Sequence, residues 1–293
     1  MNPILVTGGS GQLATALGRK APGRTQIVGR PAFDFDRPET IEASFTAANP
    51  ALVVNAAAWT AVDAAESNPE GAARANRDGP ARLASLCAAA GIPLIHISTD
   101  YVFDGRKDAP YTETDPTGPT GVYGKTKLEG EEAVLASCPH AIILRTAWVY
   151  AATGKNFVRT MLTLAQTRDR LRVVADQKGC PTAATDLADV VLAVADAVQR
   201  GWKPEYAGVF HTAGSGWTTW HGFAEAIFDA AARHGRPRPV VDPITTAEFP
   251  TPAQRPANSR LDCSKLQRVF GFTQPPWQES LIRTVDELVQ SPS

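Results

Sequence analysis

The sequence has little cysteine, no excess of charge of either sign and no long apolar run. Its four cysteines, Cys87, Cys138, Cys180 and Cys263, form no Cys-x-x-Cys pair. Neither a zinc knuckle nor a redox dithiol is therefore predicted, and the thiols are expected to be reduced and mostly buried, as in a cytoplasmic protein. A net charge of −1 offers no basic surface for nucleic acid or acidic lipid. No run reaches the ~20 apolar residues of a membrane helix, and no basic, apolar leader is expected.

What is present is an ordinary globular mixture in which short apolar runs alternate with amphipathic stretches. The 293 residues, 43% of them hydrophobic, are enough for one large domain or two unequal ones. The expected strands are Ile4–Thr7, Thr25–Val28, Leu52–Asn55, Leu94–Ser98 and Ala141–Thr146. The expected helices are Gln12–Lys20, Pro38–Ala48, Pro69–Ala90 and Tyr123–Ala136, with a kink or restart at Pro80. Continuous apolar strands are typical of a parallel sheet covered on both faces, so we predict a doubly wound, Rossmann-like α/β fold.

The alternation changes after about Tyr150. A helix follows Asn156, then a strand at Leu171–Val174, a helix at Thr185–Val198 and a strand at Val209–Thr212; the proline-rich segment Gly235–Pro256 is expected to be irregular. We therefore expect a smaller, discontinuous second domain. Residues 1–150 and roughly 183–214 would form the nucleotide-binding domain, and roughly 151–182 and 215–293 the substrate domain.

A glycine-rich loop follows the first expected strand. Gly8-Gly9-Ser10-Gly11-Gln12-Leu13-Ala14 gives a G-x-x-G-x-x-A pattern. Gly8 permits a tight turn, and Gly11 lets the backbone approach a pyrophosphate at a helix N-terminus. A plain turn would explain the glycines alone. Their place between the first strand and a helix favours a dinucleotide site.

The end of the second strand predicts which cofactor is used. A carboxylate at this point would bind the ribose hydroxyls of NAD, but the sequence has Gly29-Arg30. An arginine can pair with the 2′-phosphate of NADP, so NADPH is favoured and NADH is kept as possible. The alternative is a solvated arginine. Asp34 and Phe35 would flank the adenine, or else be a turn residue and a core residue.

Tyr123 and Lys127 form a Tyr-x-x-x-Lys pair. Residues four apart share one face of a helix. A cation beside a phenol, whose free pKa is about 10, favours phenolate and moves that pKa toward neutrality, where proton transfer works best. Thr99 ends the fourth strand, at the sheet edge where α/β proteins place their chemistry, and would donate to a substrate carbonyl. A turn residue is the alternative for Thr99.

Together these features resemble the extended short-chain dehydrogenase/reductase superfamily, and within it the family of dTDP-4-dehydrorhamnose reductases. The similarity covers nearly the whole chain. It is carried by Val54–Asp63, Ser98–Phe103, Tyr123–Glu129, Arg145–Tyr150, Asp176-Gln177 with Pro181-Thr182, Thr218–His221 and Arg255–Arg260.

The resemblance implies a role for each matching position. Tyr123 would protonate the sugar oxygen at C4 as hydride arrives from NADPH, and Lys127 would lower the phenol pKa and hold the nicotinamide ribose. Thr99, Asp100 and Trp148 would contact the substrate. The implied cofactor contacts also include Gly11, Gln12, Leu13, Ala58, Trp59 and Thr60. The implied product is dTDP-L-rhamnose for cell-surface polysaccharide, made in the cytoplasm by a monomer or homodimer.

Two departures from the family pattern matter. Trp59 replaces the usual histidine and puts an apolar ring near the cofactor. Some relatives dimerise through magnesium held by glutamates, where this chain has Ala16 and Thr185. These residues are poor ligands for a hard cation, so no metal site is predicted and a metal-bridged dimer is doubted.

Two other functions stay open. One is a dehydratase or epimerase of the same superfamily, although Tyr101 stands where dehydratases have a glutamate. The other is a non-catalytic, NADP-binding regulatory subunit. His96 lies in an expected strand and is interpreted as a core histidine.

Overall fold

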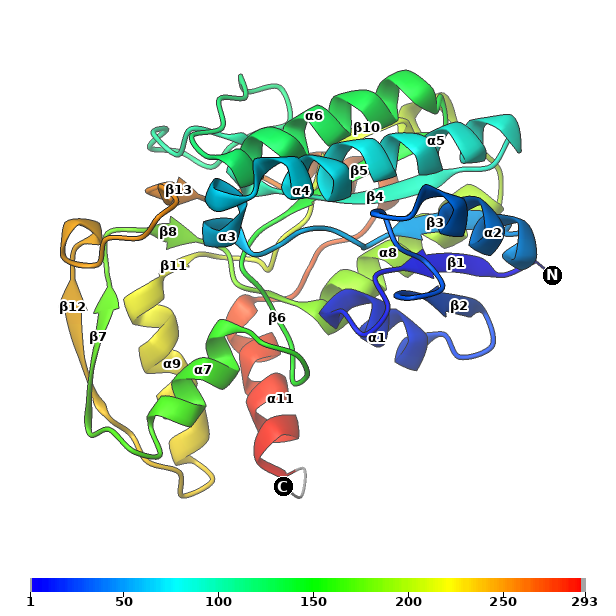
Figure 1. Cartoon of the computed structure of the whole chain (residues 1–293). Helices are drawn as coiled ribbons and strands as arrows, with labels where there is room; N and C mark the ends of the chain where they lie inside the picture. The colour runs from blue at the N-terminus through cyan, green and yellow to red at the C-terminus, as the bar shows by residue number, and fades with distance from the viewer. Residues whose placement is uncertain (1, 291–293) are drawn as a thin grey trace.

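A six-stranded parallel sheet forms the centre of the larger part of the molecule (Figure 1). The computed structural model describes residues 2–290 of the chain. The strands are β1 (Ile4–Thr7), β2 (Thr25–Val28), β3 (Leu52–Asn55), β4 (Leu94–Thr99), β5 (Ala141–Thr146) and β10 (Gly208–His211). Their order, β10-β5-β4-β3-β1-β2, reverses direction between β1 and β3. This switch point is where doubly wound sheets bind ligands.

Helices cover both faces of this sheet. One face carries α1 (Gln12–Lys20), α8 (Ala184–Gln199) and α10 (Ser264–Phe270). The other carries α2 (Pro38–Ala48), α5 (Gly79–Ala89) and α6 (Val122–Ser137). Because successive strand residues point to opposite faces, Ile4 and Val6 join the first core and Leu5 the second. The predicted doubly wound α/β fold is confirmed.

The expected long helix Pro69–Ala90 is present as one helical run from Pro69 to Ala89, which contains a π-helical turn. After α3 (Val62–Ser67), the chain forms α4 (Pro69–Ala73), a π-helical turn η1 (Arg74–Asp78) and then α5. Pro80 lies in the first turn of α5, where its missing N–H costs no hydrogen bond. A kink or restart was predicted at Pro80; the structure shows instead a continuous helix with the π-helical turn η1 just before this residue.

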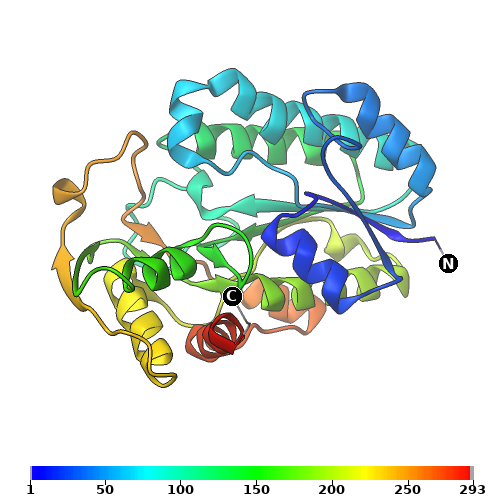
Figure 2. The same ribbon diagram turned by 60° about the horizontal axis from the view of Figure 1, so that its bottom comes forward.

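The second half of the chain builds smaller sheets beside the carboxyl ends of the large one. They contain β6 (Val149–Tyr150) with β9 (Thr182–Ala183), β7 (Arg170–Val174) with β12 (Val240–Ile244), and β8 (Lys178–Gly179) with β11 (Thr218–Thr219) and β13 (Asn258–Ser259). Helices α7 (Phe157–Leu164), α9 (Trp220–Ala232) and α11 (Trp277–Gln290) pack there around Phe223 and Trp277, and Figure 2 shows α11 nearly end-on. Short 3₁₀ turns are η2 (Asp100–Val102), η3 (Pro204–Tyr206) and η4 (Thr246–Glu248).

The prediction that Gly235–Pro256 is irregular is wrong in part. Strand β12 pairs in parallel with β7, from Val240↔Arg170 to Ile244↔Val174. Pro243 lies inside this strand, which is tolerated because β12 has β7 as its single neighbour in a two-stranded sheet.

The four cysteines are unpaired, and three of them are buried. Within residues 2–290, no helix is both long and apolar enough to span a membrane.

Candidate active site

The glycine loop after β1 is pressed between the ends of β2 and β3. A Cβ on Gly8, whose φ is +109°, would lie 3.0 Å from the Ala56 carbonyl oxygen, and one on Gly29 would lie 2.5 Å from Gly9 Cα. Side chains are therefore excluded here, and the backbone stays open to a ligand. Helix α1 begins just after Gly11 with no side-chain cap and no acidic residue in its first turn. Its free N–H groups fit the pyrophosphate of a dinucleotide.

The predicted pyrophosphate residues contribute in different ways. Gln12 lies at the loop, where its Oε1 accepts a hydrogen bond of 3.0 Å from Asn156 Nδ2. The Leu13 side chain is buried in the core, so only its backbone faces the loop. The Gln12–Asn156 bond joins the glycine loop to the segment that precedes α7.

Arg30 is exposed but paired with acidic groups. Its Nε lies 3.0 Å from Asp34 Oδ1 and its guanidinium also reaches Asp36 Oδ2 at 3.1 Å. A 2′-phosphate would therefore share the guanidinium with two carboxylates. Phe35 is buried beside Phe33, at 5.2 Å between ring centroids, which is the core position considered for it.

The segment Ala58-Trp59-Thr60 follows β3 and is fixed by a side chain from η1. Asn76 accepts from the Trp59 backbone N–H at 2.9 Å and donates to the Trp59 carbonyl at 3.2 Å. The half-buried Trp59 indole donates to the Ala61 carbonyl at 3.0 Å. These bonds hold the segment at the switch point, opposite the glycine loop.

Tyr123, Thr99 and Asp100 meet at the carboxyl end of β4. Tyr123 lies in the first turn of α6 and shares a hydrogen bond with the Thr99 side chain. Burial raises the pKa of Tyr123 to about 12, with Thr99 lowering it and Asp100 raising it. Asp100 is itself buried, which raises its pKa to about 6 against hydrogen bonds to Ser259 and Thr99.

Lys127 lies one helical turn after Tyr123 and is almost fully buried. Its Nζ donates to the Ile97 carbonyl at 2.7 Å and lies 3.4 Å from His96 Nε2. Burial lowers the pKa of Lys127 to about 8, and Glu131 opposes this shift. The pKa of Tyr123 is raised rather than moved toward neutrality, and the role of Lys127 in lowering it stays a prediction. Burial favours the neutral forms of both side chains, and it dominates both pKa values.

Trp148, a predicted substrate contact, lies just after β5. Its φ of +49° is rare for a bulky side chain. Its ring stacks on Trp220 with centroids 3.6 Å apart, and a Cβ on Gly179 would lie 2.2 Å from the indole. The half-buried indole thus lies so close to Gly179 that any side chain at that position would clash with it.

The residues that support the site were missed from the sequence. Asn76 had no motif to mark it, and Ser259 lay in a quoted motif without an assigned role. Arg255 shares a hydrogen bond with Tyr101, whose ring contacts Tyr123 edge to face at 5.4 Å. His96 is a buried, hydrogen-bonded histidine, as predicted.

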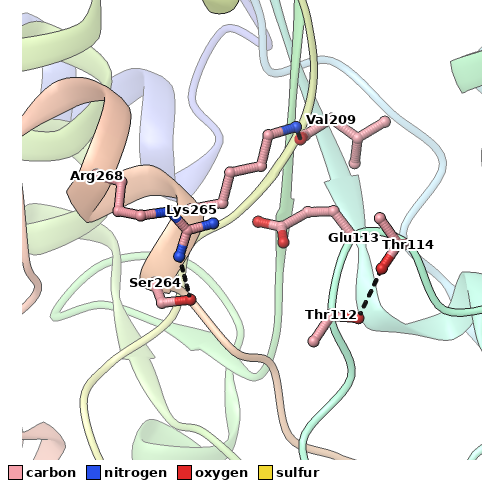
Figure 3. Close-up of a pocket in the computed structure, with 7 residues that line it drawn as sticks. All are labelled: Thr112, Glu113, Thr114, Val209, Ser264, Lys265 and Arg268. Carbon is pink, nitrogen blue, oxygen red and sulfur yellow. Dashed lines mark hydrogen bonds between the residues drawn. The ribbon is translucent and has the colours of Figure 1, made fainter.

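A cavity of about 550 Å³ lies elsewhere (Figure 3). It is lined by Thr112, Glu113, Thr114, Val209, Ser264, Lys265 and Arg268, from the segment before α6, from β10 and from α10. Lys265 is tied to the Val209 carbonyl and Glu113 to the His211 N–H. None of the predicted site residues lines it, so the cavity is separate from the chemistry described above.

The buried Ala16 and exposed Thr185 leave no carboxylate at the two positions discussed for magnesium. Within the described part of the chain, no group of three or more His, Cys, Asp or Glu side chains is placed to hold a metal ion.

Comparisons with known proteins give one consistent family. The family model described as the RmlD substrate binding domain matches residues 1–290. The dTDP-4-dehydrorhamnose reductase of Sinorhizobium fredii is 48% identical over 96% of both chains. That of Escherichia coli is 44% identical over 87% of this chain and 85% of the relative.

Solved structures of the same family are similar to this chain. A dTDP-4-dehydrorhamnose reductase from Clostridium acetobutylicum is similar at a TM-score of 0.90 and 40% identity, covering 98% of this chain and 99% of that one. The Bacillus anthracis reductase, solved in complex with NADP, is similar at a TM-score of 0.89 and 32% identity, with the same coverage.

Proposed function

Because this chain belongs to the family of dTDP-4-dehydrorhamnose reductases, we propose that it reduces the C4 keto group of dTDP-4-dehydro-6-deoxy-L-mannose to give dTDP-L-rhamnose. The protein is an NAD(P)H-dependent oxidoreductase, and the NADP complex of the Bacillus anthracis relative supports NADPH as its cofactor. We place the reaction in the cytoplasm, as a step toward cell-surface polysaccharide.

The proposal rests on one observation. Tyr123, Thr99 and Asp100 meet at the carboxyl edge of the sheet, the same edge that carries the glycine loop. NADPH, when bound, would supply the hydride. In this proposal the Thr99 hydroxyl, which donates to Asp100 Oδ1 at 3.1 Å, turns to donate to the sugar carbonyl oxygen, and the Tyr123 hydroxyl gives its proton to that oxygen. With a pKa of about 12, Tyr123 keeps its proton until the oxygen becomes basic.

The other predicted residues are assigned to binding. We propose that Gly8, Gly11, the backbone of Gln12 and Leu13, and Arg30 hold the cofactor's phosphates, with Ala58, Trp59, Thr60 and Lys127 along the rest of it. Asp100 and Trp148 would border the sugar. Residues 1–150 and about 183–214 would form the cofactor domain, and about 151–182 and 215–293 the substrate domain.

Replacing Tyr123 tests this mechanism. Tyr123→Phe keeps the ring but removes the proton, so turnover should fall about 10²–10⁴-fold, the usual contribution of a positioned acid. NADPH binding should persist, since the glycine loop and Arg30, which are proposed to hold the cofactor's phosphates, are unchanged. The measurement is NADPH oxidation with the dTDP-keto sugar, alongside cofactor titration. Wild-type turnover in the variant would remove Tyr123 from the reaction.

A further inference from the structure

A chain of buried polar side chains crosses the central sheet and ends at Lys127. Thr7 Oγ1 lies 2.6 Å from Asn55 Oδ1, Asn55 Nδ2 lies 2.9 Å from His96 Nδ1, and His96 Nε2 lies 3.4 Å from Lys127 Nζ. Each of these four side chains is at most 2% exposed. Neither the comparisons nor the mechanism proposed above gives a role to His96.

The chain has a direction, which is set at its first member. The backbone N–H of Ala57 can only donate, and it lies 3.1 Å from Thr7 Oγ1 and 3.3 Å from Asn55 Oδ1. Thr7 therefore accepts from Ala57 and donates its own hydrogen to Asn55 Oδ1. With two donors at its oxygen, the Asn55 amide must present its Nδ2 to His96.

The direction of the chain fixes the tautomer of His96. Because Asn55 Nδ2 can only donate, His96 Nδ1 accepts, and the neutral ring carries its hydrogen on Nε2. Burial and the nearby Lys127 both lower the pKa of His96 well below its usual value, so the ring stays neutral. The Nε2–H therefore faces Lys127 Nζ.

An ammonium group has only donors, whereas an amine has a lone pair that can accept. We propose that His96 is a positioning residue that holds an N–H against the Lys127 side chain and so favours its amine form. Lys127, one helical turn after Tyr123, can then gain and lose a proton near neutral pH. The proposal rests on the proposed reductase function for its relevance to turnover.

The other ionisable groups near Lys127 do not account for a preference for its amine form. Tyr123 lies one turn before Lys127 on α6, and Glu131 lies one turn after it. Glu131 raises the pKa of Lys127, but its carboxylate is already bound by Arg145 at 2.6 Å and by Ser98. The Ile97 carbonyl accepts one Lys127 hydrogen in either protonation state. Burial and the His96 N–H therefore act in the same direction on Lys127.

The tautomer can be read directly in the wild-type protein, without substrate. In protein labelled with ¹⁵N-histidine, one of the five histidines should be a neutral Nε2–H tautomer across the range from about pH 6 to 9, where a free ring would titrate near 6.5. His96→Gln, which lacks that signal, assigns it. A neutral Nδ1–H tautomer at His96 would overturn the proposal, because Nε2 would then accept from the ammonium.

A matched pair of variants tests the effect on Lys127. In His96→Gln the longer amide reaches the Nε2 position and can turn its oxygen toward Nζ. The ammonium gains an acceptor, so the alkaline limb of the kcat/KM profile should move up by about 1 to 2 pH units. In His96→Asn the shorter amide can accept the hydrogen bond from Asn55 but does not reach Lys127. The alkaline limb of the kcat/KM profile should therefore move less than in His96→Gln.

The outcomes separate this inference from the proposed function. If His96 only fills space, both variants lose turnover at every pH and the alkaline limb stays where it is, which would refute the coupling. A downward movement of the limb in His96→Gln would refute it as well. If the wild-type protein shows no substrate-dependent NADPH oxidation, the proposed function fails, while the tautomer measurement still decides the state of His96.

Discussion

The Asp100 carboxyl group is 3% exposed, and its Oδ2 has no hydrogen-bond partner within residues 2–290. Burial raises its pKa from 3.8 to about 6. The folded protein therefore keeps this proton to about pH 6, whereas the unfolded chain releases it near 3.8. Since the folded state binds more protons between these values, its stability falls as the pH rises through them.

Asp100→Asn should remove this penalty. We expect the free energy of unfolding to increase by about 1–3 kcal/mol near pH 8, and the gain to shrink as the pH falls from about 6 to below 3.8, where Asp100 is protonated in both the folded and the unfolded state. Urea unfolding at several pH values measures the difference. Turnover should fall, since Asp100 is proposed to contact the sugar, so stability and activity would move in opposite directions.

Asp104→Asn is the matched control. Asp104 has its pKa lowered by hydrogen bonds from the Arg106 N–H and the Tyr111 hydroxyl. Its carboxylate is thus favoured in the folded state, and this variant should lose stability at high pH rather than gain it. A gain of equal size in both variants would show that charge removal alone, and not burial of Asp100, is responsible.

For single residues, the sequence predicts those positions in the site that depend on short spacings along the chain. Tyr123 and Lys127 are four residues apart on one helix, and Thr99 ends a strand, so all three could be located. The environment of each group depends on segments far along the chain. Ser259 reaches Asp100, and Arg255 reaches Tyr101 beside Tyr123. No spacing rule predicts such contacts, and for the same reason the burial that raises the pKa of Tyr123 was not expected.

Helix α6 is the element that carries both Tyr123 and Lys127, and two glycines set how closely it packs. A Cβ on Gly124 would lie 2.2 Å from the Tyr101 carbonyl oxygen, and one on Gly130 would lie 1.9 Å from the Asn76 carbonyl oxygen. The opposing atoms are backbone, so they cannot rotate away. The helix therefore lies directly against η1, where Asn76 also binds Thr126 at 3.2 Å.

Gly130→Ala should push α6 away from η1. Alanine normally stabilises a helix by about 1 kcal/mol relative to glycine, but the clash here should reverse the sign and cost about 1–3 kcal/mol. Turnover should fall too, because the helix carries the proposed acid. Gly18→Ala in α1 is the control, since its Cβ meets only the flexible Ile27 side chain at 3.3 Å. Equal stability of the two variants would contradict this account of the packing.

The elements themselves were largely predictable. The five strands expected in the first half of the chain were located within one residue, because a doubly covered sheet selects continuous apolar runs. Strand β12 was missed because prolines break the pattern from which strands are recognised. The interruption at η1 was signalled by Pro80, but a π-helical turn was not, since it depends on how Arg74–Asp78 packs against α6.

At the scale of the molecule, the two halves are joined by more than the chain that crosses between them. Asp186 on α8, which covers the large sheet, accepts from Arg283 of α11 at 2.9 Å and from Ser280. Lys20 on α1 pairs with Asp189 of α8 at 2.6 Å. Helices α1, α8 and α11 thus connect the glycine loop to the smaller sheets, and the halves should unfold together.

Cofactor binding should therefore stabilise the whole molecule in one step. A ligand at 100 times its Kd adds about 2.7 kcal/mol to the free energy of unfolding, which for a chain of this size raises Tm by about 5 °C. We expect a single calorimetric transition with and without NADPH. Two transitions, of which only one moves, would show that the halves are independent.

The difference between NADPH and NADH tests Arg30 in the same experiment. At equal concentration NADPH should raise Tm more than NADH, and Arg30→Ala should remove most of that difference. In the Arg30→Ala variant, Asp34 and Asp36 lose the guanidinium that they share. Their carboxylates would then face the 2′-phosphate of NADPH without a cation between them. Arg37→Ala is the control, because Arg37 is exposed and pairs with Glu39 instead. If NADPH and NADH shift the wild-type protein equally, Arg30 does not select the cofactor, and its carboxylate partners hold the guanidinium too firmly for the phosphate to compete.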